Sequence, residues 1–162
     1  MLSYSYLPKI SIKDVISSAK KSKTLSKIND AFDICNKILK SAYANHGINA
    51  GETHFSDVWI RDSCFASWGA IELNDLDVVE RFLIHAIDHM KYDGQCPLRI
   101  GQKYFLLKYF GMKGPQGPTY IEDKYTSIPM DSNSLIIITF ALYIQKTNNL
   151  KFANKYYNNI KK

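Results

Sequence analysis

The sequence contains little arginine. Of its 21 basic residues only three, Arg61, Arg81 and Arg99, are arginines, and the others are lysines. Proteins that read nucleic acids favour arginine, because its planar guanidinium binds a base edge or a phosphate through two hydrogen bonds. The net charge of +6 would suit nucleic acid, but no basic run is longer than two residues. This balance argues against a nucleic-acid-binding protein.

Cysteine is also scarce. The three cysteines, Cys35, Cys64 and Cys96, form no CxxC pair, and their number is odd. A disulfide framework or a structural zinc site needs paired cysteines at short spacing, so neither is expected. We expect buried free thiols in a protein of a reducing compartment.

The sequence has no long hydrophobic run and no leader pattern. The longest apolar stretch, LIIITFALYI (135–144), is too short to span a bilayer. The N-terminal residues MLSYSYLPKISIKD lack the basic and then apolar regions of a signal peptide. We therefore expect a soluble, cytoplasmic protein with no membrane partner.

Helical periodicity covers most of the chain. Apolar residues recur at steps of three and four, which predicts helices at 11–21, 26–44, 61–73 and 76–90, and two more that begin at 132 and 150. The turn at Asn74-Asp75 is so short that the flanking helices must form an antiparallel hairpin. The helix after 132 is apolar nearly all round, which predicts that it is buried.

The segment 93–130 differs from the rest, because glycine and proline are concentrated there. It is expected to be a long, functional loop with some extended structure around 103–109. There is no alternation of strands and helices. The sequence therefore predicts an all-α fold of helical hairpins in a single domain over 1–162.

One short motif places charges among apolar residues. Residues 58–65 read VWIRDSCF, in which Arg61 and Asp62 follow Trp59 at the start of a predicted helix. Charges in such a setting need partners. Three roles are open for Arg61 and Asp62: a structural ion pair, a cap at the helix start, or contact with a polar ligand. The residues alone do not favour the ligand over the two structural roles.

The order of motifs resembles a known family. W-x-R-D-S is followed by an amphipathic helix pair, then by D-G-x-x-P, and then by MDSNSL at the start of a hydrophobic helix. This order, over about residues 50–160, resembles the six-hairpin, (α/α)6-barrel glycosidases, which include glucoamylases, the glucosidase part of glycogen-debranching enzymes and neutral invertases. The resemblance implies a partial (α/α)6 toroid and hydrolysis of an α-glucoside or of sucrose, without a metal or organic cofactor.

The resemblance also implies roles for individual residues. Arg61 and Asp62 would hold the hydroxyl groups of the sugar next to the scissile bond, with Trp59 as a neighbouring wall. Asp131 would be the candidate catalytic acid, and Glu122 and Asp123 are its rivals. Asp131 is equally well placed to cap the helix that it begins.

Hydrolysis by this family needs a second carboxyl, which this chain does not supply at a matching position. Twelve helices of average length need well over roughly 250 residues. We therefore expect at most half of a catalytic domain, with little or no hydrolase activity by itself. It would be completed by missing sequence, by self-association or by a partner chain.

Two other functions stay open. The chain could be a non-catalytic α-helical module that binds a partner protein through an open apolar face. His85 and His89 lie one helical turn apart, which is a spacing that metal ligands use, but no third ligand is evident. We expect no metal site.

Overall fold

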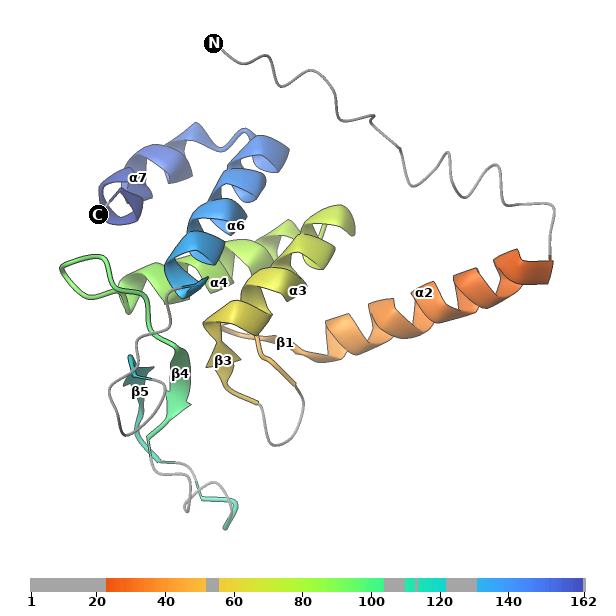
Figure 1. Cartoon of the computed structure of the whole chain (residues 1–162), viewed down its shortest axis with the longest axis horizontal. Helices are drawn as coiled ribbons and strands as arrows, with labels where there is room; N and C mark the ends of the chain where they lie inside the picture. The colour runs from red at the N-terminus through yellow and green to blue at the C-terminus, as the bar shows by residue number, and fades with distance from the viewer. Residues whose placement is uncertain (1–22, 52–55, 104–109, 113, 122–130, 162) are drawn as a thin grey trace. The chain divides into compact units, whose positions relative to one another are not determined.

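The computed structural model describes residues 23–51, 56–103, 110–112, 114–121 and 131–161 (Figure 1). The chain divides into two units, the first ending at Ile38 and the second beginning at Leu39. Helix α2 (Lys23–Ser41) confirms the helix expected over 26–44. The helix expected at 11–21 and the carboxyls of Glu122 and Asp123 lie outside the described residues. The expectation of one domain over 1–162 stays a prediction.

The second unit confirms the other expected helices to within a few residues. They are α3 (Ile60–Glu72), α4 (Leu76–Asp88), α6 (Asp131–Thr147) and α7 (Leu150–Ile160). Asn74 adopts a left-handed conformation (φ 64°) in the turn between α3 and α4, which asparagine tolerates better than most residues. The two helices therefore form the expected antiparallel hairpin (Figure 1).

The expectation of an all-α fold is wrong. The described residues form five helices and two small antiparallel sheets, so the fold is mixed α and β. One sheet pairs β1 (Tyr43–Ala44) with β2 (Gly47–Ile48), and the other has the order β3 (Val58–Trp59), β4 (Arg99–Gln102) and β5 (Gln116–Thr119). The partial (α/α)6 toroid was part of the all-α expectation, so it does not describe this chain either.

The sheets were not predicted because their strands are only two to four residues long, and because β2, β4 and β5 contain glycine or proline, which are depleted in strands. In the larger sheet Gly101 lies opposite Gly117, and Ile100 lies opposite Pro118. Proline is tolerated there because β5 is an edge strand, where a missing N–H breaks no central ladder. The extended structure expected around 103–109 lies mostly outside the described residues, but β4 ends immediately before it.

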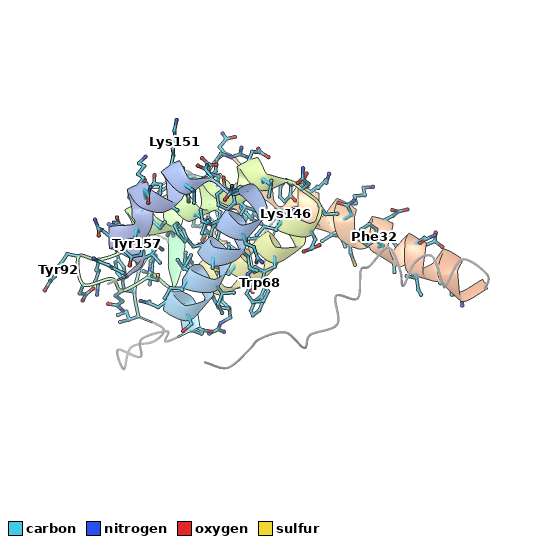
Figure 2. All side chains as sticks on the ribbon, turned by 90° about the horizontal axis from the view of Figure 1, so that it is seen from above. Phe32, Trp68, Tyr92, Lys146, Lys151 and Tyr157 are labelled. Atoms are coloured by element: carbon cyan, nitrogen blue, oxygen red, sulfur yellow. The ribbon has the colours of Figure 1, made fainter. Side chains whose placement is uncertain are left out.

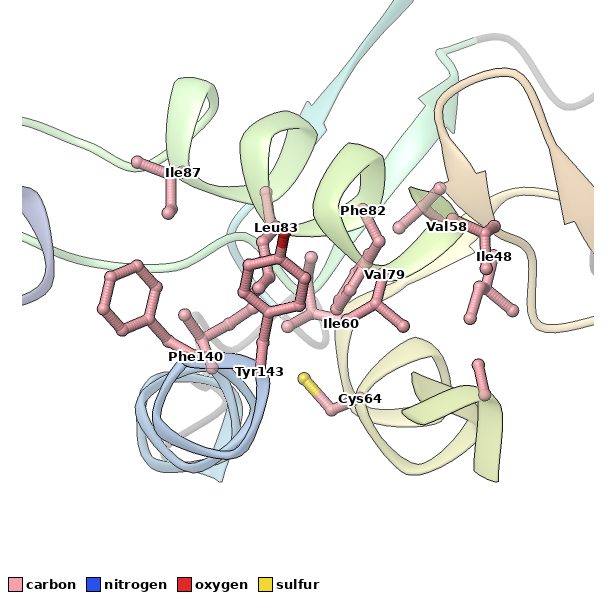
Figure 3. Close-up of a cluster of buried hydrophobic side chains, with 14 of the residues drawn as sticks. Ile48, Val58, Ile60, Cys64, Val79, Phe82, Leu83, Ile87, Phe140 and Tyr143 are labelled. Atoms are coloured by element: carbon pink, nitrogen blue, oxygen red, sulfur yellow. The ribbon is translucent and has the colours of Figure 1, made fainter. Parts of the chain in front are cut away.

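The core of the second unit lies where α4 covers both α3 and α6 (Figure 3). Val79, Phe82 and Leu83 of α4 meet Cys64 of α3 and Tyr143 of α6. Complete burial of a side chain as large as Phe82 or Leu83 contributes about 1.5–3 kcal/mol. This packing fixes the positions of α3 and α6, on which the candidate site depends.

Helix α6 is only half buried, which corrects the expectation of a fully buried helix. Ile136, Phe140 and Tyr143 face the core, whereas Ile137 and Ile138 are exposed. The apolar run on α6 therefore fills one interface and leaves an apolar surface on the opposite side.

Candidate functional site

Arg61 and Asp131 meet at the ends of two helices that run side by side. Arg61 lies in the first turn of α3, and Asp131 is the first residue of α6. The Nε of Arg61 donates a hydrogen bond to Oδ2 of Asp131, and the two residues form an ion pair. Further along, the Nε1 of Trp68 donates to Oγ1 of Thr139 at 3.0 Å. The two contacts show that α3 and α6 run parallel, and the first of them joins two residues that the family resemblance assigns to a sugar site.

This ion pair is open to solvent. The side chains of Arg61 and Asp131 are 48% and 42% exposed. Ion pairs as exposed as this one typically contribute only about 0–1 kcal/mol to stability. The pair is therefore a weak structural element, and a ligand from solvent can reach both side chains.

Asp131 is held in its ionised form. The hydrogen bond from Arg61 is the main cause that lowers the pKa of the Asp131 carboxyl below its ordinary value, and the positive charge of Arg61 lowers it further. A general acid in glycoside hydrolysis needs the opposite, a raised pKa that keeps its proton at neutral pH. The environment of Asp131 thus suits an acceptor of hydrogen bonds better than the catalytic acid that the resemblance implies.

Two oxygens beside the pair are buried and unsatisfied. Oδ1 of Asp131 and Oγ of Ser132 have no hydrogen-bond partner among the described residues. A buried polar atom without a partner is destabilising, and it commonly marks a place where water or a ligand binds. The start of α6 therefore contains two buried oxygens with unused hydrogen-bonding capacity next to the exposed ion pair.

The other two expected site residues lie in different surroundings. Asp62 is exposed in the first turn of α3 and makes no hydrogen bond or ion pair with the part of the chain that the structure describes. Trp59 is half-buried on β3, and the guanidinium carbon of Arg99 lies 5.8 Å from the centre of its ring. Asp62 is thus available beside Arg61, whereas Trp59 packs with Arg99.

Phe65 is a further candidate, which the sequence did not single out. It is 51% exposed and lies one helical turn after Arg61. Its ring packs edge-to-face against Trp68, with 4.9 Å between the ring centres. The spacing of four residues from Arg61 was the available signal, because residues i and i+4 share a helix face.

The structure also has a separate cavity of about 600 Å³. None of the four expected site residues is among the described residues that line this cavity. Three histidines, His46, His85 and His89, lie on its wall. The rings of His46 and His85 are 5.1 Å apart, and those of His85 and His89 are 4.6 Å apart. The His85–His89 spacing was the only sign of this cavity in the sequence.

The described residues support neither a metal site nor a nucleophilic thiol. No group of three or more His, Cys, Asp or Glu side chains there could hold a metal ion. Cys64 and Cys96 are buried as expected, whereas Cys35 is exposed. Burial raises the pKa of each buried thiol to about 12, so neither is a thiolate nucleophile at neutral pH.

No family model matches the chain, and no curated protein matches it significantly. Among the helices that the structure describes, none is both long and apolar enough to cross a membrane. The resemblance to six-hairpin glycosidases therefore rests on the quoted motifs alone.

Proposed function

We propose that the chain is a glycoside hydrolase-like protein, an incomplete catalytic domain whose sugar site is formed by Arg61, Asp62 and Asp131. The observation that supports this most is the ion pair between Arg61 and Asp131. It joins the W-x-R-D motif to the start of α6, and these are two of the segments on which the family resemblance depends.

The chemistry of the cluster suits a sugar. Neighbouring hydroxyl groups donate hydrogen bonds to carboxylates such as Asp62 and Asp131, and they accept them from a guanidinium such as Arg61. The exposed ring of Phe65 offers an apolar surface on which the C–H face of a sugar can lie. Buried Oδ1 of Asp131 and Oγ of Ser132 supply two further oxygens with unused capacity.

Asp131 then acts as an ionised group. It accepts a hydrogen bond from the sugar or from the attacking water, and a second carboxyl would have to donate the proton. That carboxyl would come from missing sequence or from another chain. We accordingly propose that catalysis needs added sequence, self-association or a partner chain, and that the protein acts in the cytoplasm, where its free thiols stay reduced.

Thermal protection tests the sugar site. Glucose or an acarbose-like inhibitor should raise the Tm of the chain by stabilising the folded state. The rise should vanish in Asp62→Asn, which removes one charged acceptor from an exposed position. Arg81→Gln is the matched control, because Arg81 forms an exposed ion pair with Asp77 elsewhere on the surface. A rise that persists in Asp62→Asn would show that the assigned site is wrong.

A second function is favoured by a specific feature, the apolar surface of α3 and α6. Phe65, Ile137 and Ile138 are each about half exposed. Exposed apolar residues on neighbouring helices are typical of protein-interaction surfaces. If the chain is instead an interaction module, Ile138→Lys should abolish a dimer or complex seen by sedimentation, while sugars should leave the Tm of wild type unchanged.

A further inference from the structure

The histidine-lined cavity is built from several parts of the second unit. His46 comes from the turn between β1 and β2, and His85 and His89 come from the end of α4. The larger sheet and the segments beside it contribute Asp57 and Gln102. Its volume of about 600 Å³ falls within the range of small-molecule sites.

Asp57 and Gln102, which we call the floor of the cavity, are polar lining residues and are almost completely buried. Asp57 and Gln102 are 8% and 7% exposed. Gly101 permits this arrangement, because a Cβ at that position would lie 2.3 Å from Cγ of Asp57. The Nε2 of Gln102 donates to the carbonyl oxygen of Met112 at 2.8 Å, which ties the floor to the rim of the cavity.

The negative charge of Asp57 is balanced by a positive charge of the protein itself. Nη1 of Arg99 donates to Oδ2 of Asp57 at 3.0 Å, and this pair is largely shielded from water. A cationic ligand would therefore compete with Arg99 for the carboxylate, and an anionic ligand would be repelled by it. An uncharged ligand avoids both penalties.

The histidine rings add acceptors for hydroxyl groups. His89 donates from Nδ1 to the carbonyl oxygen of His85 at 2.8 Å, so its Nε2 carries the free lone pair in the neutral ring. His46 donates from Nε2 to Oδ1 of Asn49 at 2.9 Å, which leaves the lone pair on Nδ1. Burial and the two neighbouring histidines lower the pKa of His85 to about 4, so the His85 ring is neutral at pH 7.

We propose that this cavity binds an uncharged ligand rich in hydroxyl groups, of the size of a small oligosaccharide. The lining offers carboxylate, amide and imidazole groups that form hydrogen bonds with hydroxyl groups, beside the apolar side chains of Ile100 and Met112, against which the C–H face of a sugar can lie. The proposal does not rest on the proposed function, because none of the described lining residues belongs to the Arg61 cluster.

Histidine NMR signals test this directly, because the chain contains only four histidines and three of them are among the described residues that line the cavity. Glucose, maltose and maltotriose are titrated, with glucuronate and glucosamine as charged analogues. We expect saturable shifts of the ring signals of His46, His85 and His89 with the neutral sugars. Absence of such shifts up to the solubility limit, or tighter binding of either charged analogue, would overturn the proposal.

The two tryptophans separate this test from that of the proposed function. Trp59 and Trp68 are the only indoles, and neither is among the described lining residues of the cavity. Trp68 contacts Phe65 and therefore reports on the Arg61 side of α3. A shift of the Trp68 indole signal without histidine shifts would support the proposed function and contradict this inference, and histidine shifts without a Trp68 shift would do the opposite.

Variants confirm the place of binding. Asp57→Asn removes a charged acceptor from the floor and should weaken binding about tenfold or more. Gln116→Ala changes an exposed rim residue, so the fold is retained and only a few-fold weakening is expected. Tyr92→Ala is the control, because Tyr92 is 90% exposed and projects from the loop after α4 (Figure 2). Equal affinity in Gln116→Ala, Asp57→Asn and the control would place the ligand outside the cavity.

Discussion

The guanidinium of Arg61 and the carboxylate of Asp131 form an ion pair across 70 residues of sequence. Neither residue is buried, and both lie at the first turns of parallel helices. Oδ1 of Asp131 has no partner in the described chain. The pair therefore positions a charged acceptor and a charged donor side by side while contributing little to the stability of the fold.

Arg61→Gln should raise the pKa of the Asp131 carboxyl toward its ordinary value, because the hydrogen bond and charge of Arg61 are what lower it. A carbon-detected NMR titration of the carboxyl signals measures this change. Arg81→Gln serves as the comparison: it should raise the pKa of Asp77, which Arg81 lowers in the same way, and leave Asp131 unchanged. An Asp131 titration identical in wild type and Arg61→Gln would mean that the pair does not exist in solution.

Arg61→Gln should also have little effect on folding. An exposed ion pair contributes about 0–1 kcal/mol, so the free energy of unfolding measured with urea should fall by less than about 1 kcal/mol. A loss of about 3 kcal/mol or more would identify the pair as a structural element and would remove the main support for a ligand site.

Gly47→Ala should destabilise the second unit severely. Gly47 has φ 127°, and a Cβ there would lie 2.5 Å from the Cα of Phe82, so strain and a backbone clash combine. We expect a loss of about 3 kcal/mol or more. Gly111→Ala is the matched control, since Gly111 has φ 67° but open space around it, and about 1–2 kcal/mol is expected from strain alone. Equal losses in the two variants would contradict the packing of β2 against α4.

Stability should decrease on acidification through the His85 imidazole. Burial, His89 and His46 lower its pKa from 6.5 to about 4, while Asp88 opposes them weakly. Between pH 6.5 and 4 the unfolded chain therefore binds a proton that the folded chain does not, so the stability present above pH 6.5 is lost as the pH falls. With allowance for partial exposure, the loss is about 1–2 kcal/mol.

His85→Asn provides the reference for that measurement, because it removes the titrating ring from the same position. Urea unfolding is followed at several pH values for both proteins. The difference in unfolding free energy between wild type and variant should shrink as the pH falls from 6.5 to 4. A difference that is constant with pH would show that the imidazole is not held neutral by its surroundings.

The helices were predictable because their signal is local. Apolar residues three and four positions apart define α4 without reference to any other part of the chain. The strands have no such signal: Ile100 pairs with Val58 and Pro118, and these partners are distant in sequence. The all-α expectation therefore failed where the pairing of distant strands, and not a local periodicity, determines the structure.

The candidate site was predictable only through the family resemblance. Nothing in the spacing of Arg61 and Asp131 indicates contact, and their pairing depends on the parallel packing of α3 and α6. Phe65 could not be recognised as exposed from the sequence, because its neighbours in the chain are apolar on both sides and periodicity does not distinguish a core residue from an exposed one there. The lowered pKa of Asp131 likewise follows from a contact that appears only in the folded chain.

The most direct test of the sugar site is calorimetric titration of an acarbose-like inhibitor into wild type, Arg61→Gln, Asp131→Asn and the double variant. Because the pair acts as one unit, each single change should weaken binding about tenfold or more, and the double variant should lose little beyond the larger single effect. Wild type that binds no inhibitor, or variants that bind it as tightly as wild type does, would contradict the proposed site.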